Sequence, residues 1–231
     1  MRIFRSWPAA AVSAVALVAV FGVIPAGASG SATTAQAKTD LLLRSDLPKG
    51  WLTEPGTANT QNGAFSAGAS DAQCLGESGD FPPTGPPEVD SPYFQNADGS
   101  LEIQDSISVF ATAAQAKWSF NTLANSKLAG CMTALLNSYL SRNQPKGAKV
   151  GTMTMSPPLG SRFGPHTNGY ITVAPITVQG VTMMMNQTLV AFVRGKLGQQ
   201  ILFTLYNTPG SSSSFPPSVI RHLVTVAQKR L

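Results

Sequence analysis

The sequence contains few of the residue types on which most enzymes and nucleic-acid-binding proteins depend. Its 231 residues include two histidines and two cysteines, and charged residues make up 12% of the chain. Nucleic-acid binding needs a concentrated basic face, whereas the Lys and Arg residues here are scattered along a chain with a formal net charge of +5. We therefore expect no nucleic-acid partner.

Three short motifs are also missing from the sequence. A GxSxG motif would form the nucleophile turn of many hydrolases, and GxxxxGK[ST] would cradle phosphate groups. A CxxC pair would supply ligands to many zinc sites. A weak hydrolase is an alternative that these absences disfavour, and we expect no catalytic residue, no cofactor and no metal site.

The side chains that could still carry chemistry also have structural interpretations. His166 lies in a glycine-rich segment and His222 on a predicted helix, where a histidine is usually solvated or caps an element. Asp105 interrupts the apolar stripe of a predicted strand, so it bonds either a helix N-terminus or bulge, or a ligand in a cleft. Methionine pairs at 153–155 and 183–185 either fill the core or bind Cu(I). Core filling is favoured because the second pair lies on an apolar stripe.

The first 28 residues have the pattern of a signal peptide. Arg2 and Arg5 precede the apolar run Ala9–Ile24, and a small-x-small cleavage site follows at 26–28. An uncleaved anchor is disfavoured because ~16 apolar residues are short for crossing a bilayer. The pattern predicts a secreted protein, extracellular or in the cell wall, without a stable membrane anchor.

Two cysteines in an exported chain most often form one disulfide. A bond between Cys74 and Cys131 would close a loop of about 57 residues, worth about 3–4 kcal/mol in the chain-entropy model. The alternative is two buried thiols.

The remaining chain predicts a single α+β domain over 38–231, after a small polar leader at 29–37 that is expected to be disordered. The range 55–100 is rich in Pro and Gly. It is interpreted either as a long loop that wraps the sheet or as a segment with short irregular strands. The predicted elements are a short helix at 38–45, a strand at 101–110, helices at 112–126 and 131–141, strands at 149–155 and 170–176, a hairpin at 181–207 and a closing helix at 218–231. This order favours an antiparallel β-sheet with helices packed mainly on one face.

The long hairpin over 181–207 is the element around which the fold is predicted to form. A two-residue turn would pair Leu189 with Leu202. A three-residue turn over 196–198 would pair Leu189 with Leu205 and give both strands one common apolar face. We favour the three-residue turn for that reason.

The segment Asp46-Leu47-Pro48-Lys49-Gly50-Trp51, followed by Cys74, by Ile107 to Phe110 and by Cys131, resembles the actinobacterial extracellular sensor-like domain family. This family includes the domain outside the membrane on a mycobacterial serine/threonine protein kinase, as well as free secreted proteins and lipoproteins. The resemblance spans about 41–231 and implies an antiparallel sheet with helices on one face and an open cleft for a small ligand. The kinase-attached domain has two disulfides, whereas this chain has cysteines for one. Any sensing role is expected to need a separate partner.

The resulting expectation is a secreted, non-enzymatic binding module that holds a small apolar or amphipathic ligand, or a cell-envelope component, in an open cleft. The alternative is a protein–protein interaction domain without a small-molecule site. The second face of the hairpin mixes apolar and polar groups, as ligand sites tend to do, although the loop at 55–100 could instead cover it. Candidate ligand-binding residues on this face are Met184, Asn186, Thr188, Phe192, Arg194 and Tyr206.

Overall fold

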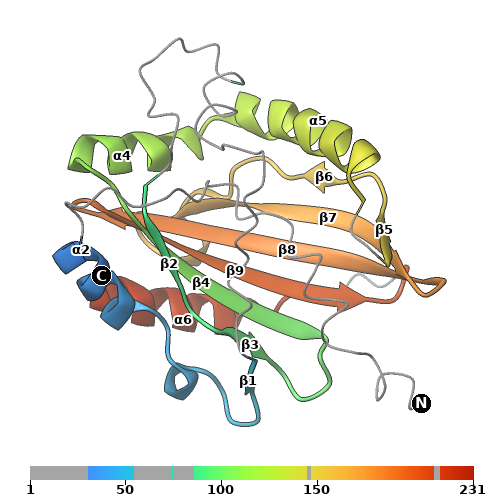
Figure 1. Cartoon of the computed structure of the whole chain (residues 1–231), viewed down its shortest axis with the longest axis horizontal. Coiled ribbons are helices and arrows are strands. Elements are labelled where there is room, and N and C mark those ends of the chain that lie inside the picture. Colours follow the sequence, from blue (N-terminus) through green and yellow to red (C-terminus); the bar gives the residue numbers. More distant parts are fainter. Residues whose placement is uncertain (1–30, 55–73, 75–85, 145–146, 211–213) are drawn as a thin grey trace.

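The computed structural model describes residues 31–54, 74, 86–144, 147–210 and 214–231. They form one body in which a large antiparallel sheet is flanked by helices (Figure 1), which confirms the α+β class. The predicted signal peptide and residues 55–73 and 75–85 of the predicted loop lie outside the described residues.

The sheet runs in the order β1-β3-β4-β9-β8-β7-β5, with β2 added to β4 and β6 added to β7. Its strands are β1 (Leu52–Glu54), β2 (Glu88–Asp90), β3 (Tyr93–Gln95), β4 (Leu101–Val109), β5 (Ala148–Val150), β6 (Thr154–Met155), β7 (Asn168–Val178), β8 (Val181–Arg194) and β9 (Leu197–Asn207). The hairpin β8–β9 lies at the centre, as the sequence predicts. The described part of 55–100 holds β2 and β3, in agreement with the interpretation that includes short strands.

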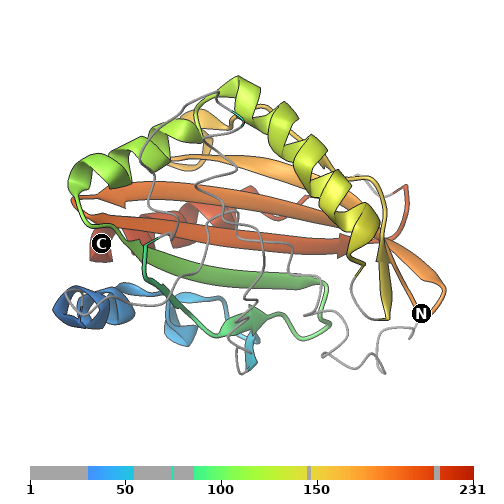
Figure 2. The same ribbon diagram turned by 45° about the horizontal axis from the view of Figure 1, so that its top comes forward.

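Helices pack on both faces of this sheet. The helices are α2 (Ser31–Asp40), α4 (Ala113–Thr122), α5 (Ser126–Arg142) and α6 (Pro217–Arg230). On one face, which we call the α5 face, α4 and α5 lie across the strands (Figure 2). Side chains such as Tyr170 and Met185 are buried beneath them. On the other, the α6 face, α2 and α6 pack over Val190 and Phe203. The central strands are therefore buried on both sides.

The register favoured for the hairpin is wrong. The strands are joined by the two-residue turn Gly195-Lys196, and Leu189 lies opposite Leu202 rather than Leu205. Gly195 has φ +59°, as the first central residue of a type II′ turn requires. The favoured register assumed that one face had to be apolar in both strands. With helices on both faces, apolar residues are needed on each, so this criterion selects the wrong pairing.

The N-terminal helix begins earlier than the sequence predicts. Residues 31–40 form α2, including most of the range expected to be disordered, and the helix expected at 38–45 ends at Asp40. Ala37 is fully buried in the core, and Gln36 Nε2 donates to Asp40 Oδ1 at 3.0 Å. Packing of the helix against the α6 face thus orders a segment whose composition alone does not favour order.

The two helices on the α5 face meet at a different place from the one predicted. The hydroxyl of Thr112 caps α4 by accepting the Gln115 N–H at 3.1 Å, as expected. Helix α5 then begins at Ser126 rather than at 131, because the Asn125 side chain caps it by accepting the Lys127 N–H at 3.0 Å. Gly130 lies within the helix and does not break it.

Asp105 connects the N-terminal segment to the sheet. Its fully buried carboxyl accepts the Leu42 N–H at 2.7 Å and the Gln199 Nε2–H groups at 2.8 and 2.9 Å. These partners belong to the chain after α2 and to β9. The sequence predicts that Asp105 bonds a helix N-terminus or bulge, or else a ligand, and neither prediction describes its role. Burial nevertheless raises the pKa of Asp105 to about 7, against the effect of these hydrogen bonds.

The titration of Asp105 should make the protein less stable as the pH rises. Because the pKa is raised in the folded state, the stabilising contribution is complete below about pH 4 and is lost as the pH rises through about 7. One pKa unit corresponds to about 1.4 kcal/mol. Urea unfolding should therefore show that the free energy of unfolding of the wild type falls between pH 5 and 8. In Asp105→Asn this fall should be about 2–3 kcal/mol smaller.

Asp98→Asn is the matched control for this measurement. Hydrogen bonds from Ser100 hold the pKa of Asp98 below its ordinary value, so this exposed carboxyl does not titrate between pH 5 and 8. Its variant should follow the wild-type profile. Parallel profiles for Asp105→Asn and the wild type would contradict the role assigned to Asp105.

Candidate functional site

The six predicted ligand-binding residues do not form one surface. Five lie on β8 and project toward the α6 face, whereas Tyr206 lies on the α5 face, because the two-residue turn places the even positions of β8 and β9 on opposite sides. Thr188 and Phe192 are buried, Met184 and Asn186 are half-buried, and Arg194 is exposed beside the turn. The register thus divides the set, and Tyr206 is the member on the face that contains the cavities described below.

Tyr206 takes part in a buried polar contact near β3. Its hydroxyl donates to Glu102 Oε2 at 3.0 Å, and Gln95 Nε2 donates to Glu102 Oε1 at 3.1 Å. Burial raises the pKa of the Glu102 carboxyl, and burial together with Glu102 raises the pKa of Tyr206 well above its ordinary value. Both side chains therefore keep their protons more readily than in water.

An apolar cavity of about 30 Å³ lies on the α5 face between α5 and the sheet. Its walls come from α5, from the chain around β6 and from the central strands. The lining residues are Leu123, Leu128, Met132, Leu136, Met153, Met155, Tyr170, Thr172, Gln187, Leu189 and Leu202. The volume exceeds that needed for one water molecule, but the walls offer few polar partners to hold one.

A second cavity of about 20 Å³ adjoins the first, near α4. Polar groups line one part of it, contributed by Ser108 on β4, Ser119 on α4 and Gln200 on β9, and the ring of Phe110 lines another. Leu123, at the C-terminal end of α4, lines both cavities and is 3% exposed. It therefore separates an apolar compartment from a partly polar one.

Carboxyl groups lie on β2, beside the strand β4 that contributes Ser108 to the polar cavity. Glu88 pairs with Ser108 and Asp90 with Ser106, and the Ser106 hydroxyl donates to Asp90 Oδ1 at 2.6 Å. Burial, and then the charge of Asp90, raise the pKa of Glu88 to about 8, although Ser106 acts in the opposite direction. Burial also raises the pKa of Asp90. The opposing effect of one hydroxyl is too small to offset desolvation in either case.

The polar residues near the cavities, such as Glu88, Glu102 and Gln200, are not among the predicted site residues. The signal that could have found them is a polar stripe: Glu102, Gln104, Ser106 and Ser108 alternate with the apolar positions of β4. On a strand, such alternation places all four on one face. The apolar positions of β4 are enough to orient the strand, so they do not single out the polar face as a site.

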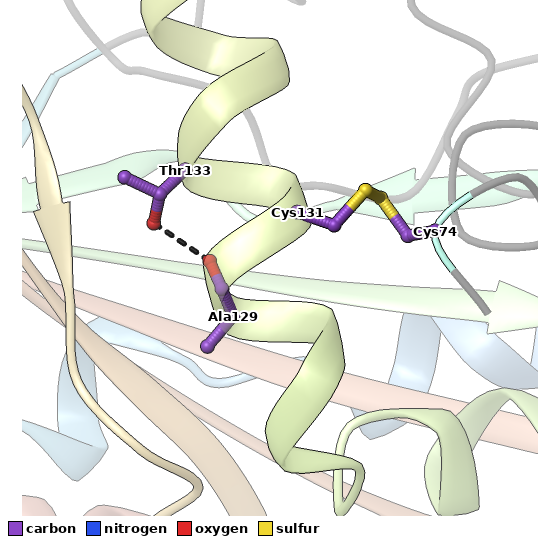
Figure 3. The surroundings of a disulfide bond; sticks show 4 residues. All are labelled: Cys74, Ala129, Cys131 and Thr133. Atoms are coloured by element: carbon purple, nitrogen blue, oxygen red, sulfur yellow. Dashed lines mark hydrogen bonds between the residues drawn. A yellow bond between two sulfur atoms is a disulfide. The ribbon is translucent and has the colours of Figure 1, made fainter.

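Helix α5 is joined to the rest of the chain by a disulfide and by side-chain amides. Cys74 and Cys131 are bonded, which confirms the predicted disulfide; near it, the Thr133 hydroxyl donates to Ala129 O at 2.7 Å within α5 (Figure 3). Asn137 accepts the Met153 N–H at 2.7 Å and donates to the Met153 carbonyl at 2.9 Å. These contacts hold the helix above the apolar cavity.

The side chains considered for metal or acid–base chemistry lie elsewhere. Within the described residues, no group of three or more His, Cys, Asp or Glu is arranged to hold a metal ion. Met183 and Met185 are buried in the core beneath α5, as core filling predicts. His166 and His222 are both exposed. Among the described helices, none is long and apolar enough to cross a membrane.

Comparison with known proteins gives only weak structural likeness. No protein-family model matches the chain, and no curated protein matches it. The crystal structure of the extracellular domain of PknH from Mycobacterium tuberculosis resembles it with a TM-score of 0.36 and 10% sequence identity, covering 70% of this chain and 90% of that one. This likeness is too weak to place the chain in a family.

Removing the Leu123 side chain should join the two cavities. Substitution of a buried Leu by Ala typically costs about 2–5 kcal/mol, and the cost rises with the space left behind. Leu123→Ala should lose stability in this range and take up xenon or benzene, as apolar cavities of sufficient size do. Chemical unfolding and xenon-dependent chemical shifts would measure the two effects.

Leu140→Ala provides the control. Leu140 is a buried residue of the same helix layer that lines neither cavity. It should lose comparable stability without gaining xenon binding next to Tyr170. Equal xenon binding in both variants would show that Leu123 does not separate the compartments.

Proposed function

We propose that this protein is a secreted, non-enzymatic binding module that holds an amphipathic small molecule, such as a cell-envelope component, on the α5 face of its sheet. The observation that carries the proposal is the position of an apolar cavity directly beside a partly polar one, with Leu123 between them. Ligand sites commonly combine an apolar lining with a few placed polar groups. A secreted location is supported by the disulfide and by the signal-like leader.

The sizes of the two cavities set a condition on this function. Cavities of about 30 and 20 Å³ hold one or two water molecules each, so a ligand with an alkyl chain can enter only if the wall moves. The wall contains methionines, among them Met132 and Met155, whose flexible side chains adapt to irregular shapes. We therefore expect binding to displace these side chains and the helix segment above them.

The chemistry of the lining supports binding rather than catalysis. The residues around both cavities are apolar, aromatic, hydroxyl-bearing or amide residues, without a histidine, cysteine or lysine among them. General acid–base catalysis would need a titratable group within hydrogen-bonding reach of the substrate. Glu88 and Asp90 lie on the neighbouring strand β2, and the lining of the smaller cavity contains no nucleophile–base pair.

Leu202→Trp tests the proposed site. Leu202 is half-buried and lines the apolar cavity, so an indole ring at this position should fill the space that a ligand would use. Native mass spectrometry of the wild type, purified from its host without denaturation, should show an added mass that disappears on denaturation. The variant should bind the same compound at least tenfold more weakly, because the indole ring occupies the space of the compound's apolar tail.

Ala134→Trp is the control, since Ala134 is exposed on α5, the helix above the apolar cavity, and lines neither cavity. It should bind the compound as the wild type does. A wild-type protein that carries no added mass, even after incubation with envelope lipid extract, would contradict the proposal. That result would favour the alternative of a protein–protein interaction domain.

A further inference from the structure

The smaller cavity contains a buried polar group without a partner. Gln200 is 8% exposed and lines the cavity, and its Oε1 has no hydrogen-bond partner within the described residues. Native proteins satisfy almost all buried polar atoms, because an unpaired one loses its hydration without compensation. An unpaired acceptor on a residue that lines a cavity therefore indicates that the cavity receives a donor.

Two carboxyl groups are placed next to this amide on the same face of the sheet. Ser106 pairs with Gln200 on one side and with Asp90 on the other, so the three residues form one row across β2, β4 and β9. Glu88 lies in the adjacent row opposite Ser108, and its Oε1 is also buried without a partner. Two rows of acceptors thus converge on the same region.

The charge in this region favours a cation. Within the described residues, neither Glu88 nor Asp90 forms an ion pair, and the ion pair between Arg230 and Asp46 belongs to the α6 side. The pKa of Glu88, raised to about 8 by burial and by Asp90, is what a carboxyl without a counter-cation shows. Once ionised, these carboxyls would attract a cation and repel an anion.

We infer that Glu88, Ser108 and Gln200 form a head-group subsite for a primary ammonium group on the amphipathic ligand. An ammonium nitrogen carries three N–H donors, and the Glu88 carboxylate, the Ser108 hydroxyl and the Gln200 carbonyl oxygen are acceptors. This inference rests on the proposed function, because the apolar part of the same molecule occupies the larger cavity on the other side of Leu123. It specifies the polar half of the ligand, which the apolar cavity alone does not.

Three six-carbon probes distinguish the head group from the tail. Hexylamine, 1-hexanol and hexanoate share one alkyl chain and differ in charge. In ¹H–¹⁵N NMR titrations of the purified protein at pH 8.5, where Glu88 with its pKa of about 8 is mostly ionised and hexylammonium keeps its proton, hexylammonium should bind about tenfold more tightly than hexanol, since hydrogen bonds to charged groups are the stronger ones. Hexanoate should bind most weakly, and hexylammonium should shift the side-chain amide resonances of Gln200.

Substitutions then assign the subsite to individual residues. Gln200→Leu and Glu88→Gln should each weaken hexylammonium binding about tenfold and leave hexanol binding unchanged, because each alters an acceptor and not the apolar cavity. Gln104→Leu is the control. Gln104 lies on the same face of β4 but lines neither cavity, so its variant should keep the wild-type preference.

The possible outcomes separate this inference from the proposed function. Equal binding of hexanol and hexylammonium, with no effect of the two substitutions, would overturn the head-group subsite. The proposed apolar site would be unaffected, and the Gln200 oxygen would then bind water alone. Tightest binding of hexanoate would also overturn it. Failure of all three probes to bind near Tyr170 and Leu202 would overturn both proposals.

Discussion

The central strands of this sheet are buried on both faces, and the rest of the structure depends on this constraint. Helices α4 and α5 pack on one side and α2 and α6 on the other. Polar side chains within the strands cannot turn to water and must find partners inside the protein. Asp105 does so through the Leu42 N–H and the Gln199 amide, and in this way fixes the N-terminal segment to two central strands.

The same constraint explains where the cavities lie. On the α5 face, β4 and β9 carry small or polar residues, including Ser108 and Gly198, where tightly packed strands would carry large apolar ones. A Cβ at Gly198 would lie 2.8 Å from the ring of Phe110, so the absence of a side chain lets this ring form a wall of the polar cavity. Functional sites are expected where a core contains both unfilled space and buried polar atoms without hydrogen-bond partners.

Features set by local pattern could be predicted from the sequence, whereas features set by tertiary packing could not. The Thr112 cap, the central hairpin and the single disulfide depend on short motifs or on a residue count, and all three are found. The hairpin register depends on which face is buried. Strand β8 is buried on both faces, so the apolar pattern of one face cannot decide the register. The candidate site inherited this error, which is why Tyr206 is separated from the other five candidates.

The attachment of α5 indicates which part of the cavity wall can move. Its C-terminal half is held by amides that mimic strand pairing: Asn137 bonds both backbone groups of Met153, and Gln144 bonds both of Val150 at 2.6 and 3.1 Å. Its N-terminal half carries Cys131, which is bonded to Cys74. The helix end before Cys131 is held by apolar packing and by a longer bond, from the Tyr170 hydroxyl to Asn125 O at 3.4 Å. Opening should therefore begin at the junction of α4 and α5, where Leu123 separates the cavities, since fewer polar contacts have to break there.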